Sequence, residues 1–159
     1  MSQRRIDTNQ IFPAAPDLGG LHEGLELGPE VFGPITREDI QRYASASGDF
    51  NPVHTDEEYA RRTGAPGVFA MGMLPAGYLA TAASKWFGGP QHLARFKVRF
   101  TTRVWPGDEI VCSARVIRKN DDVVTVSLEA KRRGDGPSEL NLDSEQIAVV
   151  GEADLRVPR

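Results

Sequence analysis

The chain has 159 residues, of which 40% are apolar and 26% are charged, and its formal net charge is −3. This length fits one domain with a sizeable core, because a chain of this size buries about 68–70% of the surface that it exposes when unfolded. The slightly negative charge, without a run of lysines or arginines, argues against binding to nucleic acid or to an anionic membrane surface.

The N-terminal residues 1–23 are expected to form an extension to a single domain over residues 24–159. Pro13, Pro16 and several glycines interrupt residues 1–20, which show no period and predict a loose arm. No apolar stretch follows the arginines at the start, and no window approaches the ~18 apolar residues of a transmembrane helix. We therefore expect a cytoplasmic protein without a signal peptide.

Two short helices are predicted in the next part of the chain, after a strand near residues 30–35. The first helix should begin after Thr36, whose hydroxyl can cap it, and end at Gly48. The second is predicted over residues 56–63 with Thr55 as its cap. Together they place a break in regular structure between residues 48 and 56.

A longer helix and a series of strands complete the domain. Residues 73–87 are almost all apolar or small, which predicts a buried helix with Pro75 in its first turn. Cys112 lies in an alternating stretch and is expected to be a buried structural thiol in a reducing compartment. Strands are predicted over residues 92–104, 109–118, 123–132 and 145–157, with turns at 105–108 and 119–122. A buried helix followed by an antiparallel meander predicts an α+β domain.

The stretch Gly48-Asp49-Phe50-Asn51-Pro52-Val53-His54 is the candidate catalytic site. Gly48 and Pro52 interrupt a helix, so the chain can turn Asp49 and His54 toward one small space. A carboxylate and an imidazole that share one water can add it to an activated double bond, or remove it from a 3-hydroxy compound. The alternatives are an aspartate that caps a turn beside a histidine bonded to the backbone, and a metal site with Asp56 that lacks a nearby second histidine or cysteine.

This stretch, within Tyr43-Ala-Ser-Ala-Ser-Gly-Asp-Phe-Asn-Pro-Val-His54-Thr-Asp56, resembles the signature of the MaoC-like, or (R)-specific enoyl-CoA hydratase, family. The resemblance covers about residues 30–130 and continues through Tyr59-Ala60, Thr63-Gly64, Gly72-Met73-Leu74, Val98-Arg99-Phe100 and Trp105-Pro106-Gly107-Asp108. It implies a hotdog fold, in which an antiparallel sheet wraps around a central, mostly apolar helix. It also implies a hydro-lyase that hydrates trans-2-enoyl-CoA thioesters or dehydrates (R)-3-hydroxyacyl thioesters, with no cofactor and no metal.

The resemblance assigns roles to single residues. Asp49 and His54 would activate the water, with His54 as the base. Gly72, at the start of the central helix, would present its backbone N–H to the thioester oxygen, and Asn51 would support the loop. An acyl tunnel would be lined by Tyr43, Phe50, Met73 and Leu74, for each of which packing in the core is the alternative.

Two positions depart from the family pattern. Met71 stands where a histidine usually precedes the glycine, and Ala80, with Thr81 beside it, stands where a serine is often found near the catalytic carboxylate. These departures bear on the orientation of Asp49 and on the substrate. They keep open the alternative of a non-catalytic hotdog subunit that supports a catalytic partner, although the intact Asp49 and His54 pair speaks against it. An acyl-CoA thioesterase on the same fold is a further alternative.

The expected partners are a CoA or acyl-carrier-protein thioester and a second copy of the chain. Family members of this kind pair their sheets across a two-fold axis, which implies a homodimer or a larger assembly of dimers. No phosphate-binding loop or dinucleotide fingerprint occurs, which argues against a nucleotide-dependent enzyme. The phosphates of the thioester carrier would meet arginine or lysine side chains. Candidates are Arg61, Arg62, Lys85, Arg95, Lys97, Arg99 and Arg103.

Overall fold

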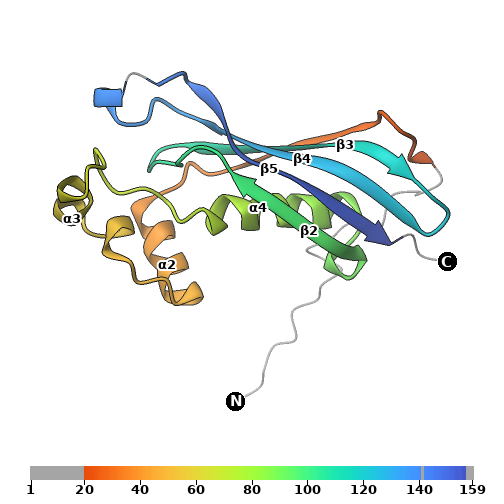
Figure 1. Ribbon diagram of the computed structural model, residues 1–159, viewed down its shortest axis with the longest axis horizontal. Helices are drawn as coiled ribbons and strands as arrows, with labels where there is room; N and C mark the ends of the chain where they lie inside the picture. The colour runs from red at the N-terminus through yellow and green to blue at the C-terminus, as the bar shows by residue number, and fades with distance from the viewer. Residues whose placement is uncertain (1–19, 141, 157–159) are drawn as a thin grey trace, which may run out of the picture.

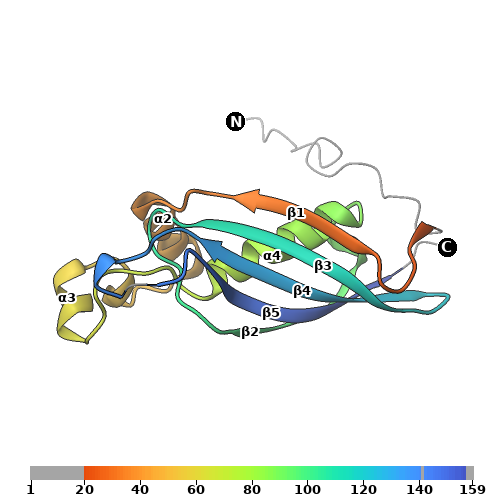
Figure 2. The same cartoon turned by 90° about the horizontal axis from the view of Figure 1, so that it is seen from above.

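One long helix lies along one face of an antiparallel sheet, as Figures 1 and 2 show. The computed structural model describes residues 20–140 and 142–156. The helix is α4, Met73–Trp86, and the 5-stranded sheet has the order β1-β3-β4-β5-β2. The strands are β1 (Glu26–Phe32), β2 (Leu93–Phe100), β3 (Glu109–Lys119), β4 (Val123–Arg133) and β5 (Glu145–Arg156). The predicted α+β hotdog arrangement is confirmed.

The core lies between α4 and the covered face of the sheet. Leu79 on α4 is fully buried, as are Val124 and Val126 on β4 and Ala153 on β5. The apolar, small-residue sequence of residues 73–87 therefore forms a buried helix, as predicted. Within the described residues, no helix combines the length and the apolar character needed to cross a membrane.

Two short helices lie beyond the end of the sheet at which α4 begins (Figures 1 and 2). In α2, Arg37–Ser47, Thr36 and Asp39 form a capping box, and Gly48 ends the helix with a φ of 72°, as its position predicted. The other helix, α3, spans Glu57–Arg62. Its cap is Asp56 and not the predicted Thr55, because the Asp56 carboxylate accepts the Tyr59 N–H.

The two outer strands differ from their predicted bounds. β1 begins at Glu26 and ends before Gly33, because Gly28 and Pro29 stay within the strand at an irregularity in its register against β3. β2 ends at Phe100 and not at residue 104. Thr101, the next residue, still bonds to Ala148 and Ile147 on β5, and farther along the Val104 carbonyl accepts the Ala70 N–H from the segment before α4. The predicted arm, residues 1–20, lies outside the described residues except for Gly20.

The thiol of Cys112 is expected to be unreactive while the protein is folded. Cys112 is fully buried on β3, and burial, with the nearby Glu30 carboxylate, raises the pKa of the thiol to about 12. At neutral pH a disulfide reagent such as DTNB should therefore release no thiol signal from the native chain. The same chain in denaturant should react with one equivalent, and fast reaction of the native protein would contradict the prediction.

Candidate active site

The loop between α2 and α3 is held by side chains that bond to its own backbone. Asp49 Oδ1 accepts the Asn51 N–H at 3.2 Å, and Asn51 Oδ1 accepts the Val53 N–H at 3.2 Å. The second bond caps a single 3₁₀ turn, Pro52–His54, which carries His54 toward the body of the domain. Asn51 thus has the contact that its predicted supporting role requires.

His54 is anchored through one ring nitrogen. Its Nδ1 lies 2.7 Å from the Phe69 carbonyl oxygen, and the two rings meet edge to face with centroids 5.0 Å apart. A carbonyl oxygen can only accept a hydrogen bond, so Nδ1 carries the proton. In the neutral imidazole the lone pair then lies on Nε2, which is the nitrogen free to act as a base.

Asp49 is exposed, and no hydrogen bond joins it to His54 among the described residues. Asp49 supports a turn and His54 bonds to the backbone, which are the contacts that the structural alternative predicted. They leave Asp49 Oδ2 and His54 Nε2 without a protein partner in the part of the chain that is described. The two groups on one loop therefore remain available to a water.

Phe69, whose carbonyl oxygen contacts His54, also lines a cleft of about 300 Å³. Its lining includes Phe69, Gly72, Phe100 and Val104. Gly72 is exposed at the start of α4, and no acceptor among the described residues takes its N–H. The structure thus places a free backbone donor and the residue that anchors His54 in the wall of one cleft.

The residues predicted to line an acyl tunnel fall into two groups. Phe50 and Met73 are exposed, with 72% and 54% of their surface accessible. Leu74 is buried in the core, and Tyr43 is partly buried and packs against the same core. Phe50 and Met73 are therefore free to contact a ligand or a second chain, whereas Leu74 has the packing role that was the alternative.

The positions that depart from the family pattern have ordinary structural roles. Met71 is buried in the core with 3% of its surface accessible. The Thr81 hydroxyl donates to the Gly77 carbonyl oxygen of its own helix at 2.9 Å. Thr81 therefore has no contact with Asp49 that would replace the serine of the family.

The cations expected to meet phosphates differ in their surroundings. Carboxylates pair with Arg61, Arg62, Lys85 and Arg95. Arg103 lines the cleft and stacks its guanidinium over the Phe69 ring, 4.6 Å from the centroid. Of the predicted cations, Arg103 is therefore the one that the cleft brings near His54.

The described residues do not form the metal site that was the alternative, and one residue of the site, Phe69, was not found from the sequence. Within the described ranges, no group of three or more His, Cys, Asp and Glu side chains could hold a metal ion, and Asp56 caps α3. Phe69 was missed from the sequence because it acts through its backbone carbonyl. Any residue type has that group, so no side-chain pattern signals it.

Comparisons with known proteins find relatives of this chain among hydratases and dehydratases. The sequence model described as "MaoC like domain" matches residues 23–133. A mitochondrial 3-hydroxyacyl-[acyl-carrier-protein] dehydratase from Arabidopsis thaliana is 29% identical over 76% of this chain and 74% of its own length. A UPF0336 protein from Streptomyces coelicolor is 32% identical over 81% and 83%. The unliganded R-hydratase PhaJ1 from Pseudomonas aeruginosa superposes with a TM-score of 0.73 at 26% identity, covering 89% of this chain and 84% of PhaJ1.

Proposed function

Since the chain belongs to the family of MaoC-like domains, we propose that it adds water to trans-2-enoyl thioesters to give (R)-3-hydroxyacyl thioesters, or catalyses the reverse reaction. The observation that carries the proposal is the hydrogen bond from His54 Nδ1 to the Phe69 carbonyl. It leaves Nε2 as a base on a loop that also presents Asp49, and Phe69 itself lines the cleft that contains Gly72. Similarity to an R-hydratase and to an acyl-carrier-protein dehydratase supports this reaction class.

In the proposed reaction His54 Nε2 takes a proton from a water that Asp49 also holds. The water oxygen bonds to C3 of the enoyl group, and negative charge develops on the thioester oxygen. The Gly72 N–H, at the start of α4, would stabilise that charge. C2 then receives a proton through the Asp49–His54 pair, so that one water is added and no proton is lost. The thioester itself acidifies C2, and the reaction needs no cofactor or metal.

The proposed assembly is a homodimer that binds a CoA or acyl-carrier-protein thioester. β2 is an edge strand of the sheet, so its outer backbone groups are open to another strand. Phe100 at its end and Met73 beside Gly72 are both at least half exposed in the single chain. A second copy would cover these apolar side chains and complete the wall of the cleft.

The test is loss of enone absorbance when purified protein meets trans-2-enoyl-CoAs of short and medium length. Loss of absorbance with formation of the (R)-3-hydroxy product is the expected result. Saturated acyl-CoAs in parallel assays test the thioesterase alternative, because hydrolysis releases free thiol. No reaction with CoA or acyl-carrier substrates, together with co-purification of a second hotdog chain, would overturn the proposal in favour of a non-catalytic subunit.

Replacing Gly72 by alanine should block the proposed thioester donor without unfolding the protein. A Cβ at this position would lie 3.1–3.3 Å from the half-exposed Phe100 ring, which has room to shift. The methyl group would crowd the surface on which the thioester has to approach the N–H, so kcat is expected to fall by about 10²–10³. Steady-state kinetics and a melting curve measure the two effects.

The matched control is Gly77→Ala on the same helix. Gly77 is exposed and its added Cβ would meet no atom within 4 Å. Alanine favours a helix interior, so this variant should keep full activity and unfold at the same or a higher temperature. Equal activities for the Gly72 and Gly77 variants would exclude Gly72 from the thioester site.

A further inference from the structure

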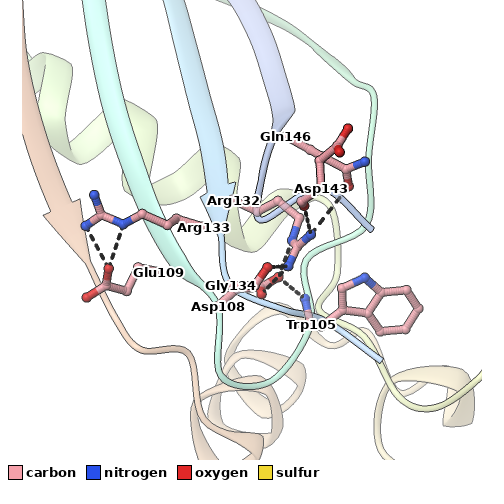
Figure 3. A network of polar contacts seen from close by, with 8 residues as sticks. All are labelled: Trp105, Asp108, Glu109, Arg132, Arg133, Gly134, Asp143 and Gln146. Carbon is pink, nitrogen blue, oxygen red and sulfur yellow. Dashed lines mark hydrogen bonds and ion pairs between the residues drawn. The ribbon is translucent and has the colours of Figure 1, made fainter. Parts of the chain in front are cut away.

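A fully buried ion pair lies near the turn that follows the cleft residue Val104. Arg132 on β4 and Asp108, in the turn before β3, have 0% and 1% of their side-chain surface accessible. Arg132 Nε donates to Asp108 Oδ2 at 2.7 Å, and a second nitrogen donates to Oδ1 at 2.6 Å (Figure 3). Arg132 also donates to the backbone oxygens of Gly134 and Asp143 and to Gln146.

The carboxylate of this pair also holds the backbone. Asp108 Oδ2 accepts the Trp105 N–H at 2.8 Å (Figure 3). The carbonyl on the other side of that peptide group belongs to Val104, and it accepts the Ala70 N–H at 2.8 Å. One peptide group is therefore bonded on both sides, to the buried carboxylate and to the segment that precedes α4.

The next peptide group continues the same line. The Ala70 N–H and the Phe69 carbonyl are the two sides of one peptide, and that carbonyl accepts the His54 Nδ1–H at 2.7 Å. The three hydrogen bonds in the line all run from donor to acceptor in the same direction, from the imidazole through the two peptide groups to the carboxylate. Hydrogen bonds aligned in this way polarise one another, and planar peptides fix each other's orientation.

We propose that the buried Arg132–Asp108 pair positions His54 through these two peptide groups. The expected effect on kcat rests on the proposed function, whereas the positioning of His54 does not. The pair keeps the Phe69 carbonyl aimed at Nδ1, which holds the proton there and directs Nε2 toward the water. Asp108 thus acts as a carboxylate that orients the His54 imidazole. It does not touch the imidazole and acts through the two peptide groups between them.

The surroundings of the peptide line favour this positioning role. The Trp105 indole is 3% accessible and meets the Phe69 ring edge to face, with centroids 5.7 Å apart. Its Nε1 has no hydrogen-bond partner among the described residues, so packing rather than a polar contact holds the ring. A methyl group at Gly134 would overlap Asp108 Oδ1, so Gly134 packs directly against the carboxylate.

The test uses the full chain labelled with ¹⁵N-histidine, in which His22 and His92 serve as internal references and His54→Asn assigns the third signal. The parent should show His54 with the proton on Nδ1 and with slow exchange of that proton. Asp108→Ala/Arg132→Met removes both charges and the acceptor of the Trp105 N–H. It should speed the exchange at least about tenfold, shift the tautomer signal, and lower kcat by about 10–100-fold at nearly constant KM, the range for orienting partners of metal-bound histidines.

Two further variants make the result specific. Asp108→Asn/Arg132→Gln removes the charges but keeps an oxygen acceptor, and should restore part of the tautomer signal and of kcat. Glu109→Ala/Arg133→Met removes the neighbouring pair, which is bonded at 2.7 Å, is exposed and does not touch the peptide line (Figure 3). This control should leave all His54 signals and the kinetics unchanged.

An unchanged His54 tautomer and exchange rate in folded Asp108→Ala/Arg132→Met would overturn the proposal. If that variant does not fold, Asp108→Asn/Arg132→Gln is used in its place and should change the same His54 signals to a smaller extent. His54 signals identical to those of the Glu109/Arg133 control would then overturn the proposal. The NMR readout needs no substrate, so a parent without hydratase activity would overturn the proposed function and leave the positioning of His54 to be judged separately.

Discussion

Replacing Asp49 by asparagine is expected to reduce kcat/KM for hydration of a trans-2-enoyl-CoA by about 10²–10⁴, the usual range for a lost acid–base group. Asparagine keeps the oxygen that accepts the Asn51 N–H, so the loop should retain its shape. It cannot take or carry the proton that the proposed reaction requires. The measurement is enone absorbance under steady-state conditions, with a melting curve to show that the fold is intact.

The matched control is Asp56→Asn, which changes the same side chain seven positions along the same loop. Asp56 caps α3 by accepting the Tyr59 N–H at 2.9 Å, and asparagine is an equally good cap. Both variants should therefore be as stable as the parent, and only the Asp49 variant should lose activity. Full activity in Asp49→Asn would remove Asp49 from the chemistry and leave His54 as the only candidate base.

Replacing Arg132 by methionine is expected to lower the free energy of unfolding by about 3–5 kcal/mol. The change leaves the Asp108 carboxylate buried without its charge partner, and an uncompensated buried charge is costly. The loss is large against the 5–15 kcal/mol by which domains are typically stable. Equilibrium unfolding in denaturant measures it, and a midpoint shift at constant slope would show that stability itself has changed.

The neighbouring arginine provides the comparison for this variant. Arg133 forms a similar pair with Glu109, but 48% of its side-chain surface is accessible. Water replaces the lost contact there, so Arg133→Met should cost only about 0–1 kcal/mol. Equal losses in the two variants would mean that burial does not set the cost. Removing Asp108 and Arg132 together should cost less than removing Arg132 alone, because no charge is then left unpaired.

Most of the secondary structure could be predicted because its causes are local. The capping box at Thr36, the left-handed Gly48 and the alternation in β3 and β4 are properties of neighbouring residues. The cap of α3 was misplaced by one residue, from Thr55 to Asp56, and the bounds of the two outer strands were wrong where distant chain segments contribute. β1 includes Gly28 and Pro29 because β3 pairs on both sides of the irregularity. β2 ends at Phe100, and Val104, which was predicted to belong to it, bonds to Ala70 and not to β5.

The sequence by itself determined the kind of site and its chemical groups. A glycine, an asparagine and a proline around Asp49 and His54 produce a loop with a carboxylate and an imidazole, and the family resemblance identified the fold. Only the tertiary structure decided which nitrogen of His54 is free and what holds it. The Phe69 carbonyl, the Val104–Trp105 peptide and the Asp108–Arg132 pair come from three separate segments. Backbone groups have no residue-specific signal, and the burial that makes an ion pair strong exists only once the chain has folded.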